Sequence, residues 1–218
     1  MLVLLLATLA AAPTTGPAPH TFTDGVAVIE AESFVEQTKD DVRRWYVQSV
    51  DAMAEVEGRD DDATEPATAS GGAYIEALPD TRVTHDDPLI SGENFSNVPG
   101  VMGVLHYRVR FDEPGRYYVW ACAHSIGTED NGIHVGLDDD WPETSQRVQW
   151  CAGKGAWTWS SNQRVPDNHC GDPLTIWLDI DEPGVRTVTI SMREDGVELD
   201  RFLLTRDAEF DPATDLAD

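Results

Sequence analysis

The tetrapeptide Asp-Glu-Pro-Gly occurs twice in the chain, at residues 112–115 and 181–184. Each copy stands between two stretches in which apolar and polar residues alternate, as they do along a half-buried β-strand. Proline followed by glycine supplies the backbone angles of a tight turn. We therefore predict antiparallel hairpins built from residues 104–111, 116–123, 174–180 and 185–192.

The rest of the chain also favours β-structure. There is no long amphipathic helix, and further strand-like runs occur at residues 26–32, 44–50, 73–76, 132–137 and 146–150. About ten short strands separated by turns predict an antiparallel β-sandwich with long irregular loops. With 218 residues and 41% hydrophobic content the chain can bury one core. We expect one domain at residues 20–207 and an acidic C-terminal tail at residues 208–218.

The chain begins with the apolar run MLVLLLATLAAA, which is followed by proline and small residues. The run is too short to span a bilayer and is typical of the apolar region of a signal peptide, although the usual positive residues before it are missing. We expect residues 1–19 to be a signal peptide and leader. The protein is then secreted or located at the cell surface, and no later segment is predicted to insert into a membrane.

Acidic side chains outnumber basic ones by 40 to 15, which gives a formal net charge of −25. Nucleic acids and anionic membranes repel such a chain, so neither is an expected partner. The charge favours solubility, cation binding or a saline habitat, and the composition leaves these open.

Three cysteines leave one without a disulfide partner. Cys151 and Cys170 lie in loop-like sequence, and in an exported protein we predict that they form a disulfide. Cys122 lies in a strand-like run and is expected to be a small core residue. A zinc site formed by His169 with Cys151 and Cys170 is the alternative, although the spacing of paired zinc ligands is missing.

The last two strand-like runs are joined by residues 193–196, Arg-Glu-Asp-Gly. Asp-Gly supplies the positive φ of a tight turn, so we predict a hairpin here too. Beyond the turn, Asp200 stands among the apolar residues Val197, Leu199 and Phe202. A lone carboxylate there would be costly to desolvate, so we expect a cation or hydrogen-bond donors beside it.

The expected partners of Asp200 lie at the other end of the chain. Glu30 and Glu32 are two residues apart in a predicted strand and would therefore share a face. If the first and last strands pair, three carboxylates converge and form an oxygen-rich site suited to a hard cation. We predict a structural Ca²⁺ bound by Glu30, Glu32 and Asp200.

Six of the seven tryptophans divide into two groups, and Trp150 is assigned to neither. Trp120 and Trp177 lie within alternating strand sequence, and we expect them in the core. A second group stands beside turn residues, where an exposed indole suits stacking on the flat face of a sugar. The alternative is that these rings only close the ends of the sandwich. The second group contains Trp45, Trp141, Trp157 and Trp159.

No catalytic motif is recognisable. The nucleophile elbow, the zinc-protease helix, the phosphate-binding loop, the dinucleotide fingerprint and the EF-hand spacing are all missing, and the six histidines are scattered. Carboxylates are too abundant to nominate a glycosidase pair. We therefore expect a protein that is not an enzyme.

The order of several short motifs resembles the galactose-binding-like, jelly-roll carbohydrate-binding modules, of which families six and thirty-five are the nearest. The resemblance covers roughly residues 26–206. Residues 129–137 are also similar to modules that accompany secreted bacterial sulfatases and glycoside hydrolases. The motifs, in order, are Val28-Ile29-Glu30-Ala31-Glu32, Ser70-Gly71-Gly72-Ala73-Tyr74, Trp157-Thr158-Trp159, Pro183-Gly184 with Thr187-Val188-Thr189-Ile190, and Asp200 before Phe202-Leu203-Leu204.

In those families an N-terminal acidic pair and an acid on the last strand hold a structural Ca²⁺, which the resemblance places on Glu30, Glu32 and Asp200. The families bind sugar mainly through loops at one end of the sandwich. Two segments, residues 51–69 and 79–100, have no clear counterpart in them.

The leading hypothesis is an exported, noncatalytic module that binds a polysaccharide or oligosaccharide. It would concentrate itself, a secreted enzyme or a surface complex on a glycan. One alternative is an adhesion or assembly domain that binds protein, and a less favoured one is a polysaccharide-degrading enzyme. The expected ligand-binding residues are Trp45, Tyr46, Asn131, Trp157, Trp159, Arg193 and Glu194.

Overall fold

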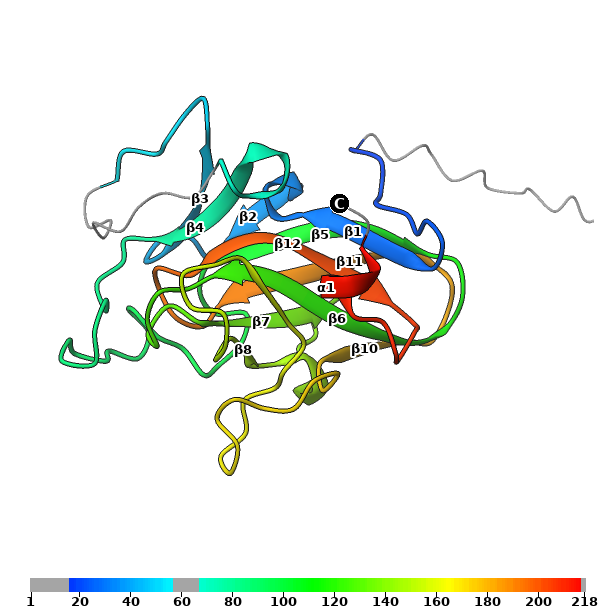
Figure 1. Ribbon diagram of the computed structural model, residues 1–218. Helices are drawn as coiled ribbons and strands as arrows, with labels where there is room; N and C mark the ends of the chain where they lie inside the picture. Colours follow the sequence, from blue (N-terminus) through cyan, green and yellow to red (C-terminus); the bar gives the residue numbers. More distant parts are fainter. Residues whose placement is uncertain (1–15, 57–66, 217–218) are drawn as a thin grey trace, which may run out of the picture.

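In the computed structural model, residues 16–56 and 67–216 are described, and they form two stacked antiparallel β-sheets (Figure 1). The predicted all-β sandwich is therefore confirmed. Most of the predicted leader and part of the acidic stretch 51–69 lie outside the described residues. Among those that are described, no helix is long and apolar enough to cross a membrane.

The first sheet has the strand order β2-β5-β11-β7-β8. Its longest contact joins β11 to β5 over eight residue pairs, from Gly184 opposite Phe111 to Ser191 opposite Val104. The strands are β2 (Glu36–Thr38), β5 (Val104–Phe111), β7 (Gly132–Leu137), β8 (Val148–Gln149) and β11 (Gly184–Met192).

The second sheet has the order β10-β6-β12-β4-β3, with β1 beside β12 and β9 beside β6. The first and last strands therefore pair, as the sequence predicts, with Glu30 opposite Arg201. The strands are β1 (Val26–Glu30), β3 (Arg44–Ser49), β4 (Ala73–Leu78), β6 (Gly115–His124), β9 (Thr158–Ser160), β10 (Trp177–Ile180) and β12 (Glu198–Thr205).

The predicted hairpins are wrong. Each of the three turns leads from one sheet to the other: residues 112–115 join β5 to β6, residues 181–184 join β10 to β11, and residues 193–197 join β11 to β12. The predicted turn chemistry is nevertheless present, because Gly115, Gly184 and Gly196 all have a positive φ, at 136°, 152° and 72°. The strands that flank each turn therefore face one another across the core and do not exchange backbone hydrogen bonds.

The core lies between the sheets and is built from the inward-facing residues of both. Large side chains that are almost completely buried in it include Trp45, Trp150, Tyr107, Phe111 and Phe202. Trp120 and Cys122, which were expected in this core, are buried but alternate with the core residues Val119, Ala121 and Ala123, so they lie on the outer face of the second sheet.

After β12 the chain continues into a four-residue helix, α1 (Pro212–Asp215), whose first turn is capped by the side chain of Asp211. The predicted tail at residues 208–218 thus contains a short ordered element. Three single 3₁₀ turns complete the described structure: η1 (Ala31–Ser33), η2 (Ser70–Gly72) and η3 (Glu143–Ser145).

Candidate functional site

The loops at one end of the sandwich enclose a polar cleft of about 540 Å³. Five segments line it, and we call it the loop cleft. They are the β4–β5 loop between residues 82 and 97, residues 128–131 after β6, residues 149–151 at the end of β8, residues 164–169 before β10, and residues 193–194 after β11. The cleft brings together residues that lie more than 100 positions apart.

Arg193 and Glu194 form a buried ion pair in the cleft wall, with Arg193 Nη1 donating to Glu194 Oε1. The two side chains are only 3% and 7% exposed. Glu194 Oε2 also accepts from the backbone N–H of Asn131 at 3.1 Å. Burial raises the pKa of Glu194, and the Arg193 charge opposes that rise. The guanidinium of Arg193 also lies over the ring of Phe95, 4.8 Å from its centre.

A second buried carboxylate, Glu129, lies in the same cleft and is 3% exposed. One of its oxygens pairs with Arg82. The other lies 2.5 Å from Nδ1 of His85 and accepts from the hydroxyl of Thr128 at 2.7 Å. The side chain of Glu129 is thus fixed from three sides.

Asn131 and Gln149 supply the neutral polar groups of the cleft, and both are 3% exposed. The amide of Gln149 donates to Asn131 Oδ1. Gln149 Oε1 is buried and has no hydrogen-bond partner among residues 16–56 and 67–216, and the same holds for Nε of Arg82. A buried acceptor without a donor is costly, so the cleft offers a ligand at least one unsatisfied hydrogen-bonding position.

Residues 193–197 can form this wall because a glycine lies opposite them. A Cβ on Gly132 would approach Arg193 Nη1 to 2.9 Å and Glu194 Oε2 to 3.0 Å, so a larger residue would displace the ion pair. The β4–β5 loop is held against the same segment by two backbone hydrogen bonds, from Ser96 N to Arg193 O and from Asp195 N to Asn94 O.

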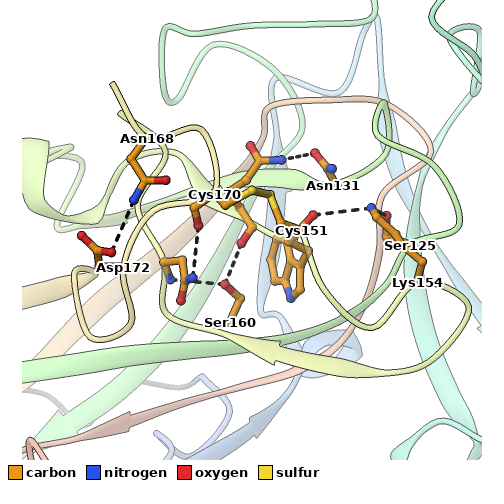
Figure 2. The surroundings of a disulfide bond; sticks show 11 residues. Ser125, Asn131, Cys151, Lys154, Ser160, Asn168, Cys170 and Asp172 are labelled. Atoms are coloured by element: carbon orange, nitrogen blue, oxygen red, sulfur yellow. Dashed lines mark hydrogen bonds between the residues drawn. A yellow bond between two sulfur atoms is a disulfide. The ribbon is translucent and has the colours of Figure 1, made fainter. Parts of the chain in front are cut away.

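The predicted disulfide between Cys151 and Cys170 is confirmed. Figure 2 shows it between Asn131 and the turn that carries Asn168 and Asp172. The segment before β10 projects from the sandwich, in yellow in Figure 1. The bond ties this segment, which contributes residues 164–169 to the cleft, to the end of β8. Cys122 is free, and it is buried on the outer face of the second sheet and not in the predicted core; burial raises its pKa to about 12.

The predicted binding residues divide into two groups. Asn131, Arg193 and Glu194 meet in the loop cleft. The prediction that Trp45 stacks on a ligand is wrong, because its side chain is 2% exposed, belongs to the core and donates from Nε1 to Gly103 O at 2.8 Å. Tyr46 is half-buried on β3, with the guanidinium of Arg44 5.9 Å from its ring centre.

Trp157 and Trp159 lie at β9, on the second sheet and outside the cleft. Both are half-buried. Trp157 donates from Nε1 to the hydroxyl of Thr68 at 3.1 Å. Trp159 lies opposite Cys122 of β6 and therefore on the outer face of the sheet.

The outer face of the second sheet carries further aromatic rings. Trp177 of β10 is opposite Tyr118 of β6, and both are half-buried. Arginines lie over two of the indoles: Arg116 is 4.2 Å from the ring centre of Trp177, and Arg201 is 5.3 Å from that of Trp159. The expectation that Trp177 lies in the core is therefore wrong, since β10 turns this ring outward.

Glu30, Glu32 and Asp200, which we call the terminal carboxylates, lie near one another. Ser70 joins two of them, because its N–H donates to Asp200 and its hydroxyl donates to Glu30, each at 2.8 Å. Glu32 lies in η1 and not on a strand as predicted. Burial, followed by the charges of Glu30 and Asp200, raises the pKa of Glu32.

Asp200 is 2% exposed, and burial raises its pKa to about 6. Oε2 of Glu30 and Oε2 of Glu32 are buried without a hydrogen-bond partner in the described part of the chain. These are hard oxygen donors of the kind Ca²⁺ takes, so the residues fit such an ion in chemistry. They do not form a ready-made cluster, since no group of three or more histidine, cysteine or acidic side chains within the described ranges is arranged to hold a metal.

Much of the cleft was not predicted from the sequence. Arg82 and His85 belong to the irregular stretch 79–100, and Glu129 lies two residues before Asn131, in a loop from which only Asn131 was expected to bind the ligand. Gln149 lies in a two-residue strand and Arg164 in a long loop. Position in a short strand was a signal for Gln149, and the sequence held none for the residues of the irregular segments.

No protein-family model matches the chain. Over 189 residues it is 53% identical to an uncharacterized protein, P23, of Formosa agariphila; the match covers 87% of this chain and 46% of that protein. The chain thus spans about half the length of this curated relative.

Among solved structures, the chain is similar to a family 35 carbohydrate-binding module from Clostridium thermocellum, with a TM-score of 0.45 and 9% identity, covering 82% of this chain and 96% of that one. It is also similar to the C-terminal family 6 module of LamC, a marine laminarinase from Zobellia galactanivorans, with a TM-score of 0.42 and 14% identity, covering 83% and 99%. Families six and thirty-five are the two that the motif order resembles.

Proposed function

We propose that the chain is a carbohydrate-binding module whose loop cleft takes sugar residues of a polysaccharide. The observation that carries the proposal is the unsatisfied acceptor of Gln149, a residue that lines the loop cleft beside polar groups held by hydrogen bonds within the protein. A sugar hydroxyl is a suitable occupant, because it can donate to Gln149 Oε1 and accept from a neighbouring N–H at the same time.

The cleft is preorganised for this task. Asn131, Glu129 and Glu194 are each held by hydrogen bonds within the protein. A ligand would therefore meet planar amide, carboxylate and guanidinium groups whose orientation costs it little further entropy. Leu89 and Phe95 add apolar surface at the rim.

The proposal differs from the prediction in where the aromatic rings act. Phe95 is the one aromatic side chain among the residues that line the loop cleft. The half-buried indoles of Trp159 and Trp177 are on the outer face of the second sheet. We place primary recognition in the polar cleft and assign these two rings no more than an accessory contact with a long glycan.

We also propose that the module is noncatalytic and exported, and that it carries an attached or associated partner to the glycan. The relative from Formosa agariphila is about twice as long as the matched region, which supports a module working beside another segment. The disulfide also suits an oxidising compartment.

Calcium belongs to the proposal as a structural ion. Glu30, Glu32 and Asp200 would hold it, and its charge would offset the repulsion between carboxylates that burial brings together. Because these residues join β1, η1 and β12, the ion would fasten the first strand of the domain to the last.

Affinity electrophoresis through gels containing plant, algal or microbial glycans tests the binding proposal, with calcium in every buffer. We expect at least one glycan to retard the protein. Gln149→Met removes the amide at nearly constant volume and should abolish most of that retardation, whereas Glu182→Gln, in the exposed turn at the opposite end of β11, should not. Migration unaffected by any glycan would refute the proposal.

A further inference from the structure

The loop cleft is richer in positive charge than a chain of net charge −25 leads one to expect. Its lining includes three arginines against two glutamates, together with two histidines. The basic residues are Arg82, Arg164, Arg193, His85 and His169. An acidic protein has thus gathered cations at one hollow of its surface.

The two glutamates already have their own cations. Glu129 pairs with Arg82, and Glu194 pairs with Arg193. The two carboxylates are buried, and their ion pairs fix the geometry of the cleft wall. Neither of these glutamates pairs with Arg164, the third arginine of the cleft.

Arg164 is half-buried and is held by its backbone. Its N–H donates to Arg147 O at 2.9 Å, and its carbonyl accepts from Arg147 Nε at 3.1 Å. Its guanidinium has no hydrogen-bond or ion-pair partner in the part of the chain that the structure describes. The side chain is therefore positioned at its base and free at its tip.

The charge of Arg164 reaches the interior of the cleft. Burial lowers the pKa of Arg193, and Arg164 is among the charges that lower it further. The same charge opposes the rise that burial causes in the pKa of Glu194. The free guanidinium thus acts within the electrostatic field of the cleft and not on a remote surface.

Arg164 also stands between two hollows. A second one, of about 390 Å³, adjoins the cleft, is lined by Arg147 and shares Asn97, Arg164 and His169 with it. A chain of linked sugars that passes from one hollow to the other must pass these three side chains. All three carry N–H groups that can donate hydrogen bonds to a ligand there.

From this arrangement we propose that the loop cleft recognises an acidic sugar, whose carboxylate or sulfate group is bound by the guanidinium of Arg164 with His169 beside it. This inference rests on the proposed function. A guanidinium presents paired N–H donors that match both kinds of oxyanion, and such charge-assisted hydrogen bonds are stronger than neutral ones. The negative charge of the rest of the protein repels a polyanion, so any preference for an acidic over a neutral sugar must come from the cleft.

Isothermal titration in calcium and 150 mM salt, with matched pairs of glycans, provides the test. Polygalacturonate is compared with its methyl ester, and dextran sulfate is compared with dextran. We expect the acidic member of at least one pair to bind about tenfold more tightly or better. The pair that shows the preference identifies carboxylate or sulfate as the bound group.

Arg164→Gln should abolish that preference while leaving the fold intact, because the guanidinium has no hydrogen-bond or ion-pair partner within the described structure. Arg164→Lys keeps the charge without the paired donors and should retain part of the preference. Arg186→Gln removes a half-buried arginine near the opposite end of β11 and should change neither the affinity for the acidic glycan nor that for its neutral counterpart.

The outcomes separate the two proposals. Equal binding of the acidic and neutral members of both pairs, or a preference that survives in Arg164→Gln, overturns the acidic-sugar inference and leaves carbohydrate binding standing. The absence of binding to any glycan, including those in the affinity gels, overturns both.

Discussion

Protonation of one buried histidine should make the protein sensitive to mild acid. His134 on β7 is completely buried. Its Nε2 donates to Ser96 O at 3.0 Å, and its Nδ1 accepts from the backbone N–H of Arg147 at 3.2 Å. The ring is therefore neutral. A second proton would bind to Nδ1, which could then no longer accept the hydrogen bond from the backbone N–H of Arg147.

Burial, and to a lesser degree the charges of Arg193 and Arg147, lowers the pKa of His134 from 6.5 to about 4. The unfolded chain takes up this proton first as the pH falls, so stability is retained above pH 6.5 and is lost between pH 6.5 and about 4. At 1.36 kcal/mol for each pH unit, the full loss is about 3 kcal/mol, and at pH 5 it has reached about 2 kcal/mol.

Urea unfolding followed by tryptophan fluorescence measures this loss at pH 7.5 and pH 5. In His134→Gln the amide still donates to Ser96 O but cannot take a proton. Between pH 7.5 and pH 5 the free energy of unfolding of the variant should therefore fall by about 2 kcal/mol less than that of the parent. His169→Gln removes an exposed imidazole instead and should behave as the parent does. An equal loss in His134→Gln and the parent would refute the reasoning.

Three further outcomes are expected. Replacing Cys151 and Cys170 by serine releases a connection 19 residues long and should lower the free energy of unfolding by about 3 kcal/mol, measured in urea. Arg43→Met leaves buried Asp195 without its cation and should cost about 3–5 kcal/mol, whereas Arg44→Met at the exposed pair next to it should cost less than about 1 kcal/mol; equal losses would contradict this. Removal of calcium should lower the melting temperature through the terminal carboxylates, and a melting curve that chelation leaves unchanged would exclude the structural ion.

The fold class was predictable because alternation along a strand records which face is buried. The partners of each strand were not, and the three turns show the reason. Proline and glycine at residues 112–115 or 181–184 set the backbone angles at which the chain reverses direction. The alternation of apolar and polar residues does not tell whether the strand after the turn pairs with the strand before it in one sheet or faces that strand across the core. Pairing of β1 with β12 was predictable because Asp200 needed a partner for its charge.

The site was predictable where residues follow a strand at the same end of the sandwich, as Asn131 and Glu194 do. Arg82 and Arg164 were missed because they lie in irregular segments, where no periodicity fixes the direction of a side chain. Trp45 was misplaced for a related reason: a tryptophan beside a turn can point into the core or out of it, and one residue of register decides which.

The connection between β11 and β12 couples the cleft to the sandwich through neighbouring side chains that point in different directions. Asp195 is completely buried and accepts from Arg43 at 3.0 Å and from the backbone N–H of Thr81 at 2.9 Å. The residues before it, Arg193 and Glu194, form the wall of the cleft. Buried ion pairs contribute little net stability, but breaking one is costly, so they fix geometry more than they add free energy. Anchoring Arg193 and Glu194 to this connection therefore fixes one wall of the cleft, against which the long loops supply the rest of the lining.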